Sequence, residues 1–313
     1  MTQYAYVFPG QGSQSVGMVS GWQDHQTVVE EVFRIAADNL GYDLLTLVGE
    51  GPDSELNRTE ITQPAMLCAG VACWRIASGQ PEMPAPAVMA GHSLGEYTAL
   101  VCSGSIELGD AVRLVARRGQ LMQAAVAPGE GAMAVIIGLG DDDVVAACAR
   151  VDDGVVEAAN FNAPGQVVIA GSAAAVERAL QYAQEMGARR AKPIPVSVPS
   201  HCSLMANAAE ELASELEQIE IRMPAVPVIH NQNAAPAASV AEIRQRLKLQ
   251  LYQPVKWVGC VEAMHSRGVT TLIECGPGKV LTGLTRRIDK SLQAYSVFDA
   301  ASLASTQQSV GEN

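Results

Sequence analysis

The chain contains few aromatic and few charged residues. Aromatic residues make up 4% and charged residues 17% of its 313 positions, whereas 48% are hydrophobic. This balance excludes an intrinsically disordered chain and is typical of a globular protein with a substantial core. No run of ~18 apolar residues occurs, and the first eight residues lack the basic segment of a secretory leader. We therefore expect a cytoplasmic protein without a membrane-spanning segment, and a monomer.

Paired cysteines are also missing. The seven cysteines are odd in number and scattered, and no two of them form a C-x-x-C pair. Disulfide frameworks and structural zinc sites both depend on repeated cysteine spacings. The sequence therefore indicates neither, and we expect no metal site.

Basic residues are scarce. Lys and Arg number 21 against 33 Asp and Glu, which gives 21 − 33 = −12. A nucleic-acid-binding protein would need a dominant basic surface to displace counterions, so we expect no nucleic-acid partner. The basic residues are unevenly placed, because 7 lie in residues 1–160 and 14 in residues 161–313. An anionic partner is therefore expected to favour the C-terminal half.

Strand and helix patterns alternate along most of the chain, which is typical of an α/β fold. We predict a large α/β-hydrolase-like domain with a parallel sheet, formed by residues 1–128 and 198–300 together. Its predicted strands lie at residues 4–8, 85–90, 226–229 and 271–275, and its predicted helices at 23–40, 63–78, 96–102, 109–125 and 204–219.

The middle of the chain has a different pattern. Residues 129–197 have the order β-α-β-β-α-β, with the last strand predicted at 191–198. That order is the signature of a ferredoxin-like unit, which forms its own antiparallel sheet. We therefore predict an inserted ferredoxin-like subdomain. Residues 301–313 are polar and predict a flexible tail.

The pentapeptide GHSLG at residues 91–95 has the G-x-S-x-G pattern and stands between a predicted strand and a predicted helix. In such a turn the serine, here Ser93, is exposed as a nucleophile, and the amide of Leu94 at the helix start can hold an oxyanion. The alternative is a glycine-rich turn in which the serine only caps the helix. The strand before the motif and the helix after it favour the nucleophile.

A serine nucleophile needs a general base, and the chain has five histidines. His201 is favoured because it lies between a predicted strand and a predicted helix, and His230 is the second candidate. Either could instead be a structural histidine. His92 directly precedes the serine and is expected to point to the opposite face. His25 and His265 lie in polar helical stretches and are expected to be solvated.

Arg118 is unusual among the arginines. The residues three, four and seven positions away from it on the predicted helix are apolar, so Arg118 lies in the buried stripe. A buried guanidinium is costly unless it meets an anion, and its planar fork fits a carboxylate. Arg118 is thus a candidate for binding a substrate carboxylate. The alternative is an internal salt bridge.

Five spaced motifs then make the chain recognisable: FPGQGSQ at residues 8–14, GHSLGEY at 91–97, NFNAPGQ at 160–166, PSH at 199–201 and GPG at 276–278. Together they resemble the malonyl-CoA:acyl carrier protein transacylases of bacterial type II fatty acid synthesis, from Met1 to about Ile288. The resemblance implies transfer of a malonyl group from malonyl-CoA to the phosphopantetheine thiol of acyl carrier protein. It also implies a malonyl-serine intermediate, ping-pong kinetics and no resident cofactor.

The resemblance also assigns roles to residues. It implies that Ser93 is the nucleophile, that His201 is the base and that Arg118 binds the malonyl carboxylate. Backbone amides of Gln11 and Leu94 would form the oxyanion hole. The other implied roles are substrate contacts from Gln250, Met122 and Asn162, and orientation of the histidine by Gln250, through its carbonyl, and by Asn231.

Other functions share parts of this pattern. An acyltransferase of polyketide synthesis or malonate decarboxylation would have the same fold and much of the same site. A serine esterase would place an acidic residue between serine and histidine, but Asp141, Asp142 and Asp143 are interpreted as helix N-terminal charges. A non-catalytic partner of acyl carrier protein is disfavoured because all three key residues are present. Cys202, next to His201, has no turn around it and is interpreted as packing.

Both implied substrates, coenzyme A and an acidic carrier protein, are anionic, whereas the chain itself is negative. Local positive potential must therefore attract them. We predict that the carrier docks across the cleft between two basic groups: Arg189, Arg190 and Lys192 on the inserted unit, and Lys256, Lys279, Arg286 and Arg287 on the large domain.

Overall fold

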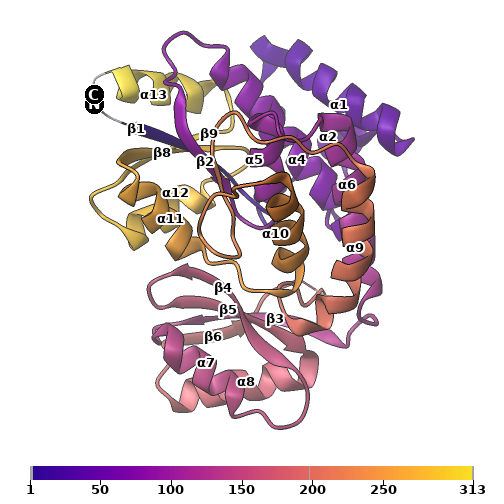
Figure 1. Ribbon diagram of the computed structural model, residues 1–313, viewed down its shortest axis with the longest axis vertical. Helices are drawn as coiled ribbons and strands as arrows, with labels where there is room; N and C mark the ends of the chain where they lie inside the picture. Colours follow the sequence, from indigo (N-terminus) through magenta and orange to yellow (C-terminus); the bar gives the residue numbers. More distant parts are fainter. Residues whose placement is uncertain (1–2, 197, 312–313) are drawn as a thin grey trace.

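The chain forms a mixed α/β fold with two separate sheets (Figure 1). The computed structural model describes residues 3–196 and 198–311; Ser197 and two residues at each end, which belong to the predicted units above, lie outside the described residues. Five parallel strands form one sheet in the order β7-β2-β1-β8-β9. Four antiparallel strands form the other in the order β4-β5-β3-β6.

The parallel sheet joins strands from both ends of the chain. β1 lies between β2 and β8, with Phe8 opposite Gly91 and Val7 opposite Glu274. Because the carboxyl ends of parallel strands meet at one edge, the loops that follow these three strands lie together there. The strands are β1 (Gln3–Phe8), β2 (Pro86–Gly91), β7 (Val228–Ile229), β8 (Val269–Cys275) and β9 (Gln293–Val297).

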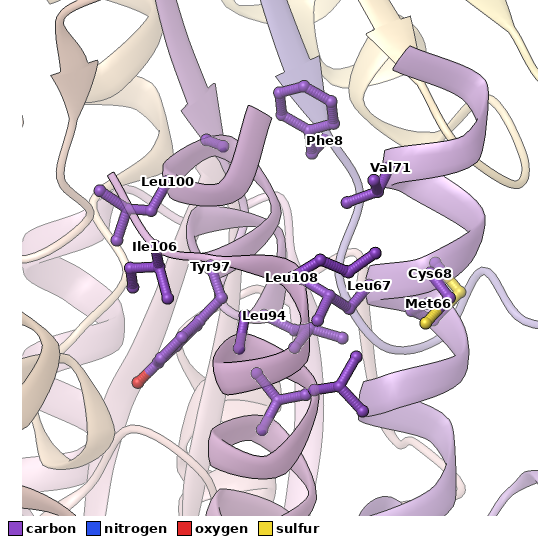
Figure 2. Packing of buried hydrophobic residues seen from close by; sticks show 14 of the residues in the cluster. Phe8, Met66, Leu67, Cys68, Val71, Leu94, Tyr97, Leu100, Ile106 and Leu108 are labelled. Atoms are coloured by element: carbon purple, nitrogen blue, oxygen red, sulfur yellow. The ribbon is translucent and has the colours of Figure 1, made fainter. Parts of the chain in front are cut away.

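Helices cover both faces of this sheet. Successive side chains of β1 enter different apolar clusters, because neighbouring residues of a strand point to opposite faces. Phe8 belongs to a cluster with residues of α4 and α5, and Figure 2 shows it near Val71 of α4. Val7 belongs instead to the cluster that contains Trp257 of α11. The helices of this part are α1 (Gln26–Leu40), α2 (Leu44–Glu50), α3 (Asp53–Leu56), α4 (Thr59–Ser78), α5 (Leu94–Cys102), α6 (Leu108–Ala124), α9 (Ala206–Gln218), α10 (Val240–Tyr252), α11 (Trp257–Ser266) and α12 (Val280–Ile288).

The antiparallel sheet lies at one end of the molecule, with its two helices on the outer side (Figure 1). Its inner face packs against Cys202 through residues such as Met133 and Val168. Backbone hydrogen bonds from Phe161 to Val255 and from Val255 to Ala159, both 2.9 Å, tie β4 to the larger part. The elements are β3 (Gly131–Ile137), α7 (Asp141–Ala149), β4 (Val156–Ala163), β5 (Gln166–Ser172), α8 (Ala173–Glu185) and β6 (Arg190–Pro193).

The prediction of a flexible C-terminal tail is wrong for the part of it that the structure describes. Ala300–Gly311 forms helix α13, in which Leu303, Thr306 and Val310 are buried. Thr306 Oγ1 also donates a hydrogen bond of 3.3 Å to the carbonyl of Ser296. The three buried residues are spaced three and four apart, so they share one helix face. The polar residues between these positions made the stripe hard to recognise in the sequence.

Two further differences concern element boundaries. The strand predicted over 191–198 ends at Pro193, because prolines at 193 and 195 limit its pairing. Helices α10 and α11 occupy a region in which the sequence patterns predicted only a polar helical stretch around His265. Among the helices that the structure describes, each lacks either the length or the apolar character that a membrane crossing requires.

Candidate active site

The serine of the GHSLG motif lies at a sharp turn between a strand and a helix. β2 ends at Gly91, α5 begins at Leu94, and Ser93 between them has a φ of 50°. A Cβ at Gly91 would stand 1.9 Å from the Gly95 carbonyl, and one at Gly95 would stand 2.0 Å from the Phe8 oxygen. Both positions therefore require glycine for β1, β2 and α5 to approach each other. The result is a strained turn that presents the serine at the carboxyl edge of the sheet.

His201 is the histidine that contacts the serine. Its Nε2 lies 2.7 Å from Ser93 Oγ, and its Nδ1 lies 2.6 Å from the backbone oxygen of Gln250. A carbonyl can only accept, so Nδ1 carries the proton and Nε2 is the acceptor for the serine hydroxyl. The structure thus places a serine, a histidine and a carbonyl in line.

The surroundings keep His201 neutral. Burial lowers the pKa of His201 to about 3, and the charge of Arg118 acts in the same direction, while the hydrogen bond to Gln250 opposes them. The side chain is only 3% exposed. A neutral imidazole at physiological pH is the form that can take a proton from serine.

Arg118 projects from α6 into the same site and is 2% exposed. Its Nη1 donates to Gln63 Oε1 at 2.7 Å. Its Nη2 donates to Gln250 Oε1 at 3.1 Å and to Ser93 Oγ at 3.2 Å. Within the part of the chain that the structure describes, no carboxylate lies at ion-pair distance from it. The alternative of an internal salt bridge is therefore wrong, and the guanidinium is surrounded by neutral groups.

A buried carboxylate lies behind these residues. Glu96 Oε2 accepts from the backbone N–H of Asn231 at 2.8 Å and from Gln250 Nε2 at 2.9 Å. Its Oε1 lies 2.7 Å from Nδ1 of His230. His230, the second candidate base, therefore faces Glu96, and the histidine in contact with the serine is His201.

The structure corrects two implied roles. Asn231 hydrogen-bonds the turn at residues 91–95, called the elbow below. Its Oδ1 accepts from Ser93 N–H at 2.7 Å, and its Nδ2 donates to the Gly91 carbonyl at 2.7 Å. It does not contact His201 among the described hydrogen bonds. Gln250 has no exposed surface and lies behind Arg118, so its side chain holds the guanidinium instead of lining the substrate cavity. The carbonyl of Gln250 does contact His201 as predicted, so the correction concerns its side chain and Asn231.

A cavity of about 240 Å³ adjoins the serine and histidine. Its walls come from the loop after β1, the elbow, α6, the antiparallel sheet, the segment after β6, and α12. The predicted residues Gln11, Leu94, Met122 and Asn162 all line it, together with Ser93, His201 and Arg118. Leu94 begins α5, so its amide has no partner within the helix and can donate into the cavity.

The expected direction of His92 is wrong. His92 lines the cavity, its Nε2 lies 2.8 Å from Asn162 Oδ1, and its ring packs against Trp257. Alternation along a strand suggested the opposite face, but the chain leaves β2 at Gly91, where that alternation ends. His92 thus fixes one wall of the cavity.

Gln63 and Glu96 are functional candidates that the sequence analysis missed. Both are polar residues inside helices whose other residues are mostly buried and apolar. A polar residue within a buried apolar helix is the signal that identified Arg118. The same signal in α4 and α5 would have identified Gln63 and Glu96. By contrast, Cys202 is packed as predicted, since its side chain is fully buried in an apolar cluster and its Sγ faces the Pro199 carbonyl. This burial raises the pKa of its thiol to about 12. Asp141, Asp142 and Asp143 form the first turn of α7, as predicted.

We predict that serine reactivity persists at acid pH. Because the pKa of His201 is lowered to about 3, labelling of Ser93 by a neutral sulfonyl fluoride should change by less than about twofold between pH 7 and pH 5. A histidine of ordinary pKa would lose roughly 20-fold over that range. Intact-protein mass spectrometry measures the rate, and His201→Ala should label slowly at every pH. A midpoint near pH 6.5 would contradict the prediction.

Comparison with known proteins gives a consistent result. The model of the acyl transferase domain family matches residues 5–311. The malonyl CoA-acyl carrier protein transacylases of Haemophilus influenzae and Escherichia coli K12 are 52% and 53% identical to the chain; the matches cover 98% and 97% of this chain and 99% and 98% of theirs.

Solved structures agree. An acyl carrier protein S-malonyltransferase from Vibrio cholerae has a TM-score of 0.94 and 53% identity, covering 97% of this chain and 100% of its own. A malonyl-transacylase solved in complex with a type II polyketide synthase acyl-carrier protein has a TM-score of 0.96 and 51% identity. That match covers 98% of this chain and 100% of the solved one. The chain therefore belongs to the acyl transferase family and, within it, to the malonyl-CoA:acyl carrier protein transacylases.

Proposed function

We propose that this chain transfers a malonyl group from malonyl-CoA to the phosphopantetheine thiol of acyl carrier protein and so supplies fatty acid elongation. The observation that carries the proposal is the position of Arg118, whose Nη2 lies 3.2 Å from Ser93 Oγ. A single methylene separates the two carbonyl carbons of a malonyl group. A thioester carbon at Ser93 therefore brings the free carboxylate to the guanidinium, which suits a short diacid.

In the first half-reaction Ser93 Oγ attacks the thioester carbon while its proton passes to His201 Nε2. The amides of Gln11 and Leu94 hold the oxyanion. The carbon–sulfur bond then breaks, and the proton on His201 goes to the coenzyme A sulfur. The product is the malonyl ester of Ser93.

The second half-reaction reverses these steps with a different thiol. His201 takes the proton of the phosphopantetheine thiol, whose sulfur attacks the ester carbon, and then returns a proton to Ser93 Oγ as the C–O bond breaks. One site serves both thiols, so ping-pong kinetics are expected. Every step uses side chains and backbone amides of this chain, so the proposal includes no resident cofactor or metal.

An esterase is less well supported. Esterases with this elbow orient the histidine with a carboxylate, whereas here a backbone carbonyl contacts His201 Nδ1. A buried guanidinium beside the nucleophile would also disfavour uncharged acyl groups. Both features support selection of an anionic acyl group over general ester cleavage.

The finer description of the fold also belongs to this proposal. We propose an α/β-hydrolase-like domain of residues 1–128 and 198–300 interrupted by a ferredoxin-like subdomain of residues 129–197. The order β4-β5-β3-β6 and the placing of α7 and α8 on one face support the second assignment. The cytoplasmic location and the monomeric state remain predictions.

The direct test is covalent loading. Intact-protein mass spectrometry after malonyl-CoA should show one malonyl adduct, which holo acyl carrier protein then removes. Ser93→Ala should show no adduct, while Cys202→Ser should load normally. An adduct on Ser93→Ala would contradict the assignment of the nucleophile. A polyketide synthase carrier tested in parallel would separate the two pathways by the relative rate of unloading.

Arg118→Ala should separate malonyl from acetyl substrates. The variant should lose malonyl transfer by several orders of magnitude while accepting acetyl-CoA relatively better, because each lost charged hydrogen bond costs about 1.5 to 3 kcal/mol. Steady-state kcat/KM for the two substrates measures the ratio. Arg117→Ala is the matched control, since Arg117 lies half-exposed on the other face and pairs with Glu211 and Glu215. Equal losses for both substrates would remove the proposed role.

The carrier protein is proposed to dock across the mouth of the cavity. Ile194 and Val196, which follow β6, line the cavity on one side, and Val280, Leu281 and Leu284 of α12 line it on the other. The two predicted basic groups lie beside these segments. All seven are exposed: Arg189, Arg190, Lys192, Lys256, Lys279, Arg286 and Arg287.

Charge reversal tests this docking. Arg189→Glu/Arg190→Glu, and separately Arg286→Glu/Arg287→Glu, should raise the apparent KM for the carrier by on the order of tenfold at low salt, with a smaller effect at high salt. Arg34→Glu/Arg113→Glu is a control with equal change of charge, because neither Arg34 of α1 nor Arg113 of α6 lines the cavity. An unchanged KM in both test variants would show that the basic groups do not dock the carrier.

A further inference from the structure

Glu96 is a fully buried carboxylate that the mechanism above does not use. Its exposure is 0%, and it lies in the first turn of α5, three residues after the nucleophile. It accepts hydrogen bonds from Asn231 N–H, from Gln250 Nε2 and, through its other oxygen, from His230 Nδ1. A buried carboxylate is costly to maintain, so its position needs a physical reason.

The first effect of Glu96 is on the amide of Gln250. A carboxylate only accepts hydrogen bonds, so the NH₂ group of Gln250 must face Glu96. The same NH₂ group donates to the carbonyl of Ser93 at 3.0 Å. The amide oxygen is then turned toward Arg118 Nη2 at 3.1 Å. With the amide reversed, donors would face donors at Arg118, and the guanidinium would lose a partner.

The second effect of Glu96 is electrostatic. The contacts of Arg118 are neutral: two amide oxygens, the serine hydroxyl and the ring of Tyr97, 5.4 Å away. Burial lowers the pKa of Arg118, and Tyr97 and Glu96 act against that shift. Glu96 therefore acts electrostatically on the guanidinium without contacting it, because the amide of Gln250 lies between them.

We propose that Glu96 is a positioning residue that acts through Gln250: it orients the amide that holds Arg118 and balances the buried positive charge while leaving the guanidinium open to a substrate carboxylate. This inference rests on the proposed function of Arg118. A carboxylate in direct contact with Arg118 would occupy the same donors as the malonyl group. Placing the counter-charge behind Gln250 avoids that competition.

The arrangement has a consequence for substrate affinity. In the free protein the Glu96 and Arg118 charges sum to zero, and a malonyl carboxylate adds a second negative charge to the same buried cluster. Glu96 therefore weakens ground-state binding of the malonyl group. Such weakening limits the stability of the acyl-enzyme and favours its transfer onward.

The test is a double-variant cycle of Glu96→Gln and Arg118→Met, read by thermal unfolding of the full chain. In Glu96→Gln the amide can keep the shape of the carboxylate, and His230 can change tautomer to accept from the new NH₂ group. We expect Glu96→Gln alone to lower Tm by about 2 to 4 °C, because Arg118 loses its counter-charge. In the Arg118→Met background the same change should be neutral or stabilising, because it then removes an unpaired buried charge.

Glu274→Gln is the matched control. Glu274 is also fully buried and acceptor-only, but it caps α12 through Leu281 N–H and Thr282 N–H and does not contact the arginine. Its effect on Tm should be the same with and without Arg118→Met. Additive Tm changes for Glu96 as well would overturn the proposal, since they would mean that the Glu96 charge does not act on Arg118. If Glu96→Gln does not fold, recovery of folded double variant supports the coupling, and continued failure overturns it.

Kinetics supply a readout that a merely structural role would not produce. Glu96→Gln should lower KM for malonyl-CoA on the order of tenfold and slow unloading to the carrier, while KM for acetyl-CoA stays unchanged. A raised KM for malonyl-CoA would overturn the proposal. Failure of the proposed function would be seen separately, as absence of a malonyl adduct on the unaltered chain, and would leave the Tm cycle interpretable.

Discussion

A buried guanidinium beside a nucleophilic serine is the constraint on which the rest of this site depends. Arg118 is 2% exposed and has no carboxylate at ion-pair distance among the described residues. Taking such a charge out of water is costly, and the chain offsets the cost with amide oxygens from Gln63 and Gln250. On the proposals above, Glu96 supplies a counter-charge from behind Gln250, and the guanidinium itself stays open to an anionic acyl group. The buried charge of Arg118 thus affects both the stability of the pocket and the proposed selection of the substrate.

The same charge affects the base. Burial is the main reason for the low pKa of His201, and the charge of Arg118 lowers it further. On the proposed function, a malonyl carboxylate that pairs with Arg118 would compensate that part of the shift, and the imidazole would become a stronger base once the correct acyl group is present. A group without a carboxylate leaves both the guanidinium unpaired and the base weak. Discrimination can therefore act on the proton transfer as well as on binding.

Local pattern was enough to predict the residues whose roles are set by their own element. The elbow around Ser93 follows from two glycines between a strand and a helix, and the burial of Arg118 follows from helical periodicity. The contacts of Gln63, Glu96 and Asn231 could not be predicted in this way, because each joins elements far apart in the chain: Glu96 and Asn231 are 135 residues apart. Such hydrogen bonds depend on the packing of whole elements, which periodicity does not describe. The C-terminal helix was missed for a simpler reason, since three buried positions were concealed by polar neighbours.

The carbonyl that orients His201 fits this electrostatic design. A carboxylate in place of that backbone carbonyl would hold the imidazole equally well, but it would add a negative charge beside His201, within the electrostatic reach of Arg118. That charge would disfavour entry of an anionic acyl group. A neutral carbonyl gives the tautomer and the orientation without adding charge. The negative charge that the site does contain, Glu96, stands one amide farther back, where it stabilises the arginine without competing for its donors.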